Sequence, residues 1–190
     1  MVARQPTPAR VGFVVEGPSD YEFFRSQRTW LEARSILPKI RQARDRPQLV
    51  RRAVDHYKAL RMQGCERVVF VLDQDDDGCA PAAARLLGPV RQMDGVIVAV
   101  AAKELEAWLL ADVTALRRVC EQNRPDGHTD GLDNPKGVLR EMFRKVRHKH
   151  LSEVEMVRCF TPHFSFDRAA GYNQSAARFV ARLSRLSTDQ

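Results

Sequence analysis

A short apolar run that ends abruptly in acidic residues is the feature that most constrains this chain of 190 residues. The run spans residues 68–72 with the sequence VVFVL, and four acids follow it: Asp73, Asp75, Asp76 and Asp77. Because consecutive apolar residues leave no polar face, the run predicts a strand that is buried on both sides in a parallel sheet. Two carboxylates about 4 Å apart repel by roughly 4 kcal/mol at an effective dielectric constant of 20, so acids gathered here favour a bound cation. We therefore expect a ligand site where this strand ends.

The sequence on both sides of this run predicts further strands, separated by helices. Two more apolar runs, residues 11–15 and 96–101, predict further buried strands, and a weaker edge strand is expected at residues 35–40. Apolar residues recur at helical spacing between these runs, most clearly over residues 47–64. The alternation of strands and helices predicts an α/β fold over residues 11–112, with a mainly parallel four-stranded sheet flanked by helices. The first ten residues carry two prolines and no periodicity, and we expect them to form a frayed leader.

The last third of the chain has a different character, because the strand pattern disappears after Asp112. Helical spacing predicts helices over residues 114–122, 136–146 and 172–186, with a polar loop over residues 123–134. We interpret residues 113–190 as a helical appendage that packs on the α/β domain, and one continuous domain remains an alternative. Phe164 and Phe166 are expected to pack in a core, rather than to stack on nucleic-acid bases.

Acidic residues follow three of the predicted strands. Glu16 follows the first, the acids from Asp73 follow the third, and Glu104 and Glu106 follow the last. The carboxyl ends of parallel strands meet at one edge of a sheet, and carboxylates gathered there suit Mg²⁺ or Mn²⁺, which bind oxygen at about 2.0–2.1 Å. In an extended segment Asp73 and Asp75 point to the same side, which makes them the favoured pair. Taken alone, Glu16 also fits an ordinary loop acid or an acid near a helix N-terminus, and the aspartates alone also fit a solvated acidic turn.

The balance of charge favours a polyanionic partner. Lys and Arg number 31 and Asp and Glu number 24, which gives a net charge of +7. Nucleic acid is the first candidate, although a basic surface without a partner is an equal alternative. The predicted phosphate contacts come from one helix in the α/β region and from the end of a later helix: Arg51, Arg52, Arg144, Lys145, Arg147 and Lys149. For the second group, a solvated helix end is the plainer explanation.

Localisation follows from what the sequence lacks. It has no apolar stretch near 18 residues, and its N-terminus lacks the apolar centre of a signal peptide. The four cysteines are scattered, without metal-binding spacing, and are expected to be reduced thiols. These features predict a cytoplasmic protein that does not bind membranes.

Two of these motifs together resemble a known superfamily. The glutamate in VVEGPSD and the D-x-D in VLDQDDDG are similar to the motifs of the Toprim domain, which occurs in topoisomerases, primases and certain nucleases. The segment KELEAWLLAD and the later NPKGVL and FSFDRAAGYNQSAARF resemble an uncharacterised bacterial family of stand-alone Toprim-like proteins. Members of that family are often encoded beside ABC-type ATPases, in settings suggestive of phage defence.

The resemblance implies roles for individual residues. Glu16 would act as general acid or base or as a metal ligand, and Asp73 and Asp75 would bind Mg²⁺, with Asp77 as an additional acid. Glu106, and less surely Lys103, would match an acid and a base near the last strand of the nuclease members. The tyrosine motif of topoisomerases and the zinc region of primases are not found in the sequence.

These observations lead to two functional hypotheses. The first is a Mg²⁺-dependent nuclease that cleaves DNA or RNA, as the effector of an ATPase-partnered defence system. In this hypothesis Lys103 stabilises the charge that develops on the phosphate. The second is a non-catalytic module that binds or regulates a partner ATPase. The sequence leaves open whether the chain forms a homodimer.

Overall fold

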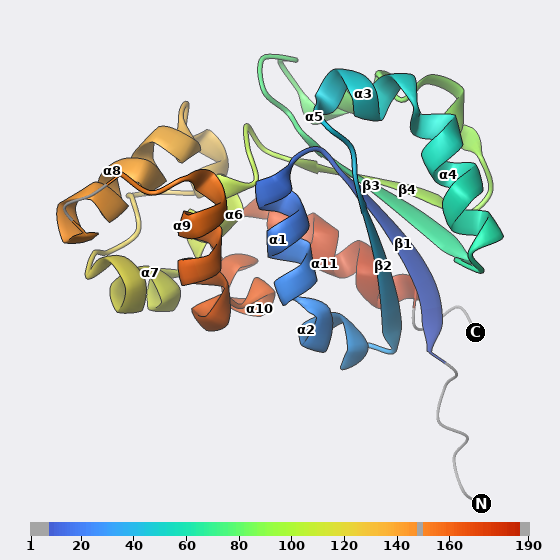
Figure 1. The fold of residues 1–190 in the computed structure, drawn as a ribbon. Coiled ribbons are helices and arrows are strands. Elements are labelled where there is room, and N and C mark those ends of the chain that lie inside the picture. The colour runs from blue at the N-terminus through green and yellow to red at the C-terminus, as the bar shows by residue number, and fades with distance from the viewer. Residues whose placement is uncertain (1–7, 148–149, 187–190) are drawn as a thin grey trace, which may run out of the picture.

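A parallel β-sheet forms the centre of the molecule in the computed structural model, which describes residues 8–147 and 150–186 (Figure 1). Its strands are β1 (Ala9–Val15), β2 (Ile36–Gln42), β3 (Arg67–Asp73) and β4 (Val96–Ala101). They lie in the order β2-β1-β3-β4, and every neighbouring pair is parallel. This confirms the predicted α/β architecture with a four-stranded sheet and an edge strand near residues 35–40.

The start of β1 corrects one expectation. Ala9 and Arg10 were expected to belong to a frayed leader, but they pair with Ile36 and Leu37 of β2. The side chain of Ala9 is buried, so the strand gains both hydrogen bonds and apolar contact from these two residues. Residues 1–7 lie outside the described residues.

The side chains of β3 alternate between the two faces of the sheet, so both faces are apolar and both are covered by helices. Val68, Phe70 and Leu72 belong to one core, and Val69 and Val71 belong to the other. The first core is covered by α3 (Arg46–Arg51), α4 (Ala53–Met62), α5 (Ala80–Arg85) and the 3₁₀ helix η1 (Gly88–Gln92). The second is covered by α1 (Pro18–Ser26), α2 (Arg28–Glu32), α6 (Glu106–Ala111), α10 (Phe166–Ala169) and α11 (Gln174–Leu186).

One predicted helix is divided in the structure. The helix expected over residues 47–64 is interrupted at Arg52, whose φ of −106° and ψ of 18° are not helical and which separates α3 from α4. Between β3 and β4 the chain forms α5 and η1, and Gly88, the first residue of η1, has a φ of 55°, which glycine adopts without steric cost.

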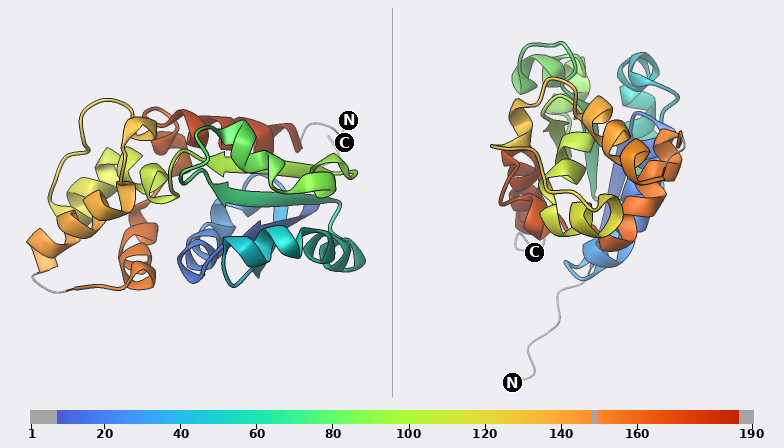
Figure 2. Two further views of the ribbon diagram at one scale, coloured as in Figure 1. Left: turned by 90° about the horizontal axis from the view of Figure 1, so that it is seen from above. Right: turned by 90° about the vertical axis from the view of Figure 1, so that its left-hand side faces the viewer.

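The remaining elements lie beyond the carboxyl ends of the strands, to the left of the sheet in Figure 1 and in the left view of Figure 2. They are α7 (Val113–Cys120), η2 (Thr129–Gly131), α8 (Pro135–Arg147), α9 (Glu153–Phe160) and η3 (Thr161–His163). Neither α9 nor α10 was expected. At the start of α9 the side chain of Ser152 accepts from the N–H of Glu155, and that of Glu155 accepts from the N–H of Ser152. This capping box stabilises a helix whose apolar pattern is short.

Aromatic side chains connect these later helices to the sheet. Phe164 and Phe166 are buried and contact Phe23 of α1 with ring centroids 5.1 and 5.4 Å apart, which confirms their predicted core position. Phe179 of α11 lies 5.8 Å from Phe24 of α1 in the same core. The helices after residue 112 therefore share one apolar core with the sheet. None of the helices in the described part of the chain is long and apolar enough to cross a membrane.

Candidate functional site

The carboxyl ends of β1 and β3 bring Glu16 and Asp73 together. The two strands are neighbours in the sheet, Glu16 directly follows β1, and Asp73 is the last residue of β3. The Oε1 atom of Glu16 accepts a hydrogen bond of 2.9 Å from the backbone N–H of Asp73. The parallel order of the strands thus places these two acids at one edge, as the sequence predicted.

The surroundings of these acids disfavour negative charge. Burial raises the pKa of Glu16 to about 7, although the N–H of Asp73 opposes this shift. Burial also raises the pKa of Asp73 well above its usual range, and the negative charges of Asp20, Glu16 and Glu106 raise it further. Several carboxyl groups therefore share a poorly hydrated region, where each makes ionisation of the others less favourable.

Asp20 joins this cluster from the first turn of α1. Pro18 starts the helix, and the side chain of Asp20 reaches back to accept a hydrogen bond of 2.9 Å from the N–H of Gly17. Burial raises the pKa of Asp20, while this hydrogen bond and Lys136 lower it. Asp20 was not among the site residues predicted from the sequence. The observation that could have revealed its second role is that it lies four residues after Glu16, across a tight turn.

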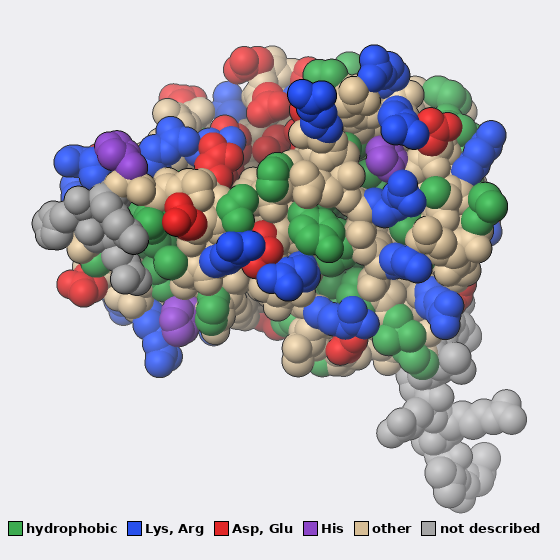
Figure 3. All heavy atoms as spheres, viewed as in Figure 1, with side chains coloured by type: hydrophobic (Ala, Val, Ile, Leu, Met, Phe, Trp, Pro, Cys, Tyr) green, Lys and Arg blue, Asp and Glu red, His purple; other side chains and the backbone are tan. Residues whose placement is uncertain are grey.

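Glu106 enters the same cluster from the loop that follows β4. It is the first residue of α6, its exposed fraction is 5%, and burial raises its pKa to about 7. We refer to Glu16, Asp20, Asp73 and Glu106 as the carboxylate cluster. In Figure 3 acidic side chains gather near the top centre of the molecule, in the same region as the loops that follow the strands.

Lys136, the second residue of α8, brings a positive charge to the carboxylate cluster. Its backbone N–H donates to Oε2 of Glu104 at 2.9 Å, and its Nζ lies 3.6 Å from Oε1 of the same residue. The Nζ also lies 3.8 Å from Oε1 of Glu153 in α9. Burial lowers the pKa of Lys136, but Glu106, Glu104 and Glu153 outweigh burial and raise it, so the ammonium charge is retained. The helices beyond the sheet therefore complete the site.

Asp75 and Asp77 contact a different cation. Arg46, at the start of α3, donates to Oδ2 of Asp75 at 2.6 Å and also pairs with Asp77. The expectation that Asp73 and Asp75 point to one side was based on an extended segment, and that premise is wrong. The strand ends at Asp73, and Asp75 lies in a turn with a φ of 47°, which directs its side chain toward α3.

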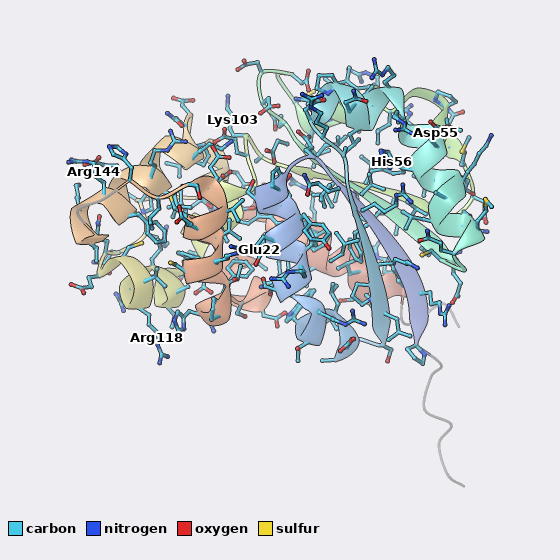
Figure 4. All side chains as sticks on the ribbon, viewed as in Figure 1. Glu22, Asp55, His56, Lys103, Arg118 and Arg144 are labelled. Carbon is cyan, nitrogen blue, oxygen red and sulfur yellow. The ribbon has the colours of Figure 1, made fainter. Side chains whose placement is uncertain are left out.

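Lys103, the lysine suggested by the sequence, has a mainly backbone role here. Its φ is 60°, and its carbonyl oxygen accepts a hydrogen bond of 2.9 Å from the N–H of Asp75. This bond joins the loop after β4 to the loop after β3. Figure 4 shows Lys103 near the top of the molecule, between α8 and the loop that follows β3.

The chemistry of the carboxylate cluster fits a hard divalent cation, because its donors are carboxylate oxygens whose repulsion a cation would relieve. The side chains are not, however, arranged as the ligands of a metal ion. Within the described ranges, no three His, Cys, Asp or Glu side chains converge closely enough to hold a metal ion. Binding of a cation would therefore require these side chains to move toward one another.

Of the predicted phosphate-binding residues, those that the structure describes lie around the junction of α3 and α4 and on α8. Arg51 and Arg52 are exposed around the junction of α3 and α4, and Arg52 lies 3.4 Å from Asp55. Arg144 donates to both carboxylate oxygens of Glu141, and Figure 4 places Arg144 at the left end of the molecule. Lys145 is exposed and Arg147 is the last residue of α8, while Lys149 lies outside the described residues.

Lys136 is the main site residue that sequence reasoning missed. It lies in the segment NPKGVL, 35 residues after the end of the last predicted strand, and only the packing of α8 brings it to the sheet edge.

Comparisons of this chain with models of known families, with curated proteins and with solved structures give no match.

Proposed function

We propose that this protein is a Toprim-like, divalent-cation-dependent nuclease that hydrolyses phosphodiester bonds in DNA or RNA. The observation that carries the proposal is the carboxylate cluster at the carboxyl edge of a parallel sheet, with Lys136 beside it. A group of half-buried and buried acids with raised pKa values is costly to maintain for structure alone and is common at catalytic sites.

The residues divide into proton-transfer and charge-stabilising roles. Glu16 has a pKa of about 7, which suits a group that accepts a proton from water at neutral pH. Lys136 keeps its charge beside the acids and would stabilise negative charge on a phosphate oxygen. Asp73 and Glu106 would hold Mg²⁺ or Mn²⁺, and Asp75 and Asp77 would join only after release from Arg46. When bound, such a cation neutralises the phosphate and promotes ionisation of water.

A cleavage assay tests this proposal. The wild-type protein is incubated with supercoiled plasmid and with single-stranded RNA, in Mg²⁺ or Mn²⁺, beside Glu16→Gln and Asp73→Asn. We expect the wild type to cleave at least one substrate and each variant to lose about 10²-fold or more of the rate. Asp76→Asn is the matched control, because Asp76 is an exposed acid in the same loop.

A binding measurement accompanies the assay. Mn²⁺ should raise the thermal midpoint of the wild type and of Asp76→Asn, and should raise that of Asp73→Asn much less. Equal cleavage by the wild type and both site variants would assign the activity to a contaminant. Absence of cleavage with both metals and both substrates would contradict the nuclease proposal.

The second candidate is a non-catalytic module that binds a partner such as an ABC-type ATPase. It is favoured by the pairing of Arg46 with Asp75 and Asp77, which neutralises two of the acids expected to bind metal. A wild-type protein that binds Mn²⁺ without any cleavage, and that co-purifies with an ATPase, would support this candidate.

A further inference from the structure

The two edge strands of the sheet are protected to different degrees. The edge strand β2 has the sequence ILPKIRQ, with Pro38, Lys39 and Arg41 in its interior, and prolines and charges of this kind discourage pairing with another strand. The opposite edge strand, β4, has the sequence VIVAVA and carries neither. An apolar edge without such protection is a template for an additional strand.

The backbone of β4 shows which of its groups are available. The carbonyl groups of Gly95 and Ala101 accept hydrogen bonds from Val68 and Gln74, so the odd-numbered residues of this segment face β3. Because backbone groups alternate along a strand, the N–H and C=O groups of Val98 and Val100 point away from the sheet. Within the described residues, no hydrogen bond to the N–H of Val98 or Val100 is found outside the strand pairing.

Side chains of α11 already contact this outward-facing backbone. Arg182 donates to the carbonyl oxygen of Val98, and the hydroxyl of Ser175 accepts from the N–H of Ala102 at 3.1 Å. Each contact occupies a position that a backbone group of a fifth strand would take. The contacts therefore mark the outer edge of β4 as a surface that can form hydrogen bonds.

A groove follows this edge between the two helical layers. One cavity of about 410 Å³ lies between α5 and α11, and a second of about 590 Å³ continues between η1 and the end of α11. Ala84, Val98 and Arg182 line both cavities, which makes the groove continuous along β4. In the left view of Figure 2, α11 runs beside the sheet along β4.

The charges around the groove specify the kind of partner. Arg178 and Arg182 of α11 and Arg91 of η1 are exposed at its walls, and none of the described residues that line the two cavities is acidic. A second copy of the chain, paired edge to edge, would bring these arginines against their own copies. The charge therefore favours an acidic partner over self-association.

We propose that the groove binds an extended acidic segment of a partner protein, which adds to β4 as a fifth strand. The backbone of the segment bonds to the outward groups of Val98 and Val100 and displaces Arg182 from the carbonyl oxygen of Val98. Its acidic side chains, which all lie on one face of the added strand, pair with Arg178 of α11. The alternate apolar side chains point to the other face, toward α5 and η1. Backbone bonds provide affinity in this mode of recognition, and side chains provide the preference for acid. This binding is independent of the carboxylate cluster.

A peptide of alternating valine and glutamate, blocked at both ends, is the probe. Binding is measured by fluorescence anisotropy, and amide hydrogen exchange is followed in the complex. We expect the amides of Val98 and Val100 to become protected, whereas those of Ile97 and Ala99 are already protected by β3. A copy of the peptide with alternate amides N-methylated keeps its charge but loses backbone donors, and it should bind about tenfold more weakly or worse.

Two variants separate the backbone and charge contributions. Val98→Pro removes an outward N–H without removing a bond to β3, and it should abolish binding, while Val98→Thr should retain it. Arg178→Glu should also abolish binding. Arg118→Glu is the charge control, because Figure 4 places Arg118 on α7, away from β4.

Each alternative occupant predicts a different result. Equal affinity for the N-methylated peptide, or absence of peptide binding at millimolar concentration, overturns the proposal. Tighter binding of an oligothymidylate that competes with the peptide would assign the arginines to nucleic acid instead. A dimer in sedimentation that dissociates in Val98→Pro would assign the edge to a second copy of the chain.

Discussion

Glu16 is held in a position where its charge lowers the stability of the folded protein. Its pKa is about 7 in the folded state and 4.5 without the fold, so between these values the folded state binds more protons than the unfolded state. The free energy of unfolding should therefore decrease as the pH rises from about 4.5 to 7, and level off above this range. Glu16→Gln should lose much of this decrease, because the amide has no proton to release and its oxygen still accepts from the N–H of Asp73.

The measurement is urea unfolding of the wild type and Glu16→Gln at pH 5 and pH 8. At pH 8 the variant should be more stable than the wild type by about 2 kcal/mol, since one pKa unit corresponds to about 1.4 kcal/mol and partial hydration reduces the effect. Asp76→Asn should behave as the wild type at both pH values. A variant that is less stable than the wild type at pH 8 would show that the charge of Glu16 stabilises the fold.

The ammonium group of Lys136 offsets the negative charge of nearby carboxylates, which are poorly hydrated in the folded protein. Lys136→Met keeps the length and apolar stem of the side chain but leaves Glu104 and Glu106 without the ammonium group. We expect a loss of about 1–2 kcal/mol in the free energy of unfolding at pH 8, because the lysine is partly exposed. The loss should diminish at pH 5, where Glu106 is protonated in both proteins. An equal loss at the two pH values would indicate lost packing instead.

At the scale of elements, Arg46 fixes the loop after β3 to the start of α3. Its side chain is 16% exposed and pairs with both Asp75 and Asp77. In Arg46→Ala, amides of residues 74–79 should exchange hydrogen faster, while those of β3 should not change. Arg44→Ala is the control, because Arg44 is an exposed arginine in the same segment. Unchanged exchange in the loop of Arg46→Ala would show that backbone bonds alone hold it.

The close packing of α4 on β1 depends on a glycine. A Cβ atom at Gly12 would lie 2.7 Å from Cδ1 and 3.1 Å from Cβ of Leu60, which is too close for carbon atoms. Gly12→Ala should therefore cost about 1–3 kcal/mol in the wild type. In a Leu60→Ala background the same change should cost less, because the contacts with the two methyl groups are gone and only the contact of 3.1 Å with Cβ remains. Chemical unfolding of the four proteins in this cycle measures the coupling, and additive effects would contradict a direct contact.

The elements differ in how far the sequence could predict them. Strands β3 and β4 were predictable because uninterrupted apolar runs have few alternatives, and parallel pairing then brought Glu16 and Asp73 to one edge. The direction of the Asp75 side chain was not predictable. It depends on a turn after Asp73 that is held by the hydrogen bond from the N–H of Asp75 to the carbonyl oxygen of Lys103 and by the ion pair with Arg46. Lys136 reaches the carboxylate cluster only through the packing of α8, a long-range contact that leaves no local pattern.

At the scale of the whole molecule, polar contacts as well as the shared core join the sheet to the later helices. Asp112, with no exposed surface, accepts hydrogen bonds from Arg168 and from the N–H of Ser165. In the turn after α2, Arg34 forms two hydrogen bonds with Asp167 of α10. If two independent domains met near residue 112, their separation would break these hydrogen bonds and expose apolar surface on both domains.

Unfolding of the whole chain should accordingly be one cooperative transition. The protein has two tryptophans, and Trp30→Phe leaves Trp108, which is fully buried in α6 and donates to Ser175 of α11. In urea, the fluorescence of Trp108 and the circular dichroism of all helices and strands should change with the same midpoint and the same slope. Under this expectation a fragment of residues 8–112 would not reach a cooperative folded state, because Phe23, Phe24 and Trp108 would lose their partners. Separate transitions for the two probes, or a fragment that unfolds cooperatively by itself, would instead establish an independent α/β domain.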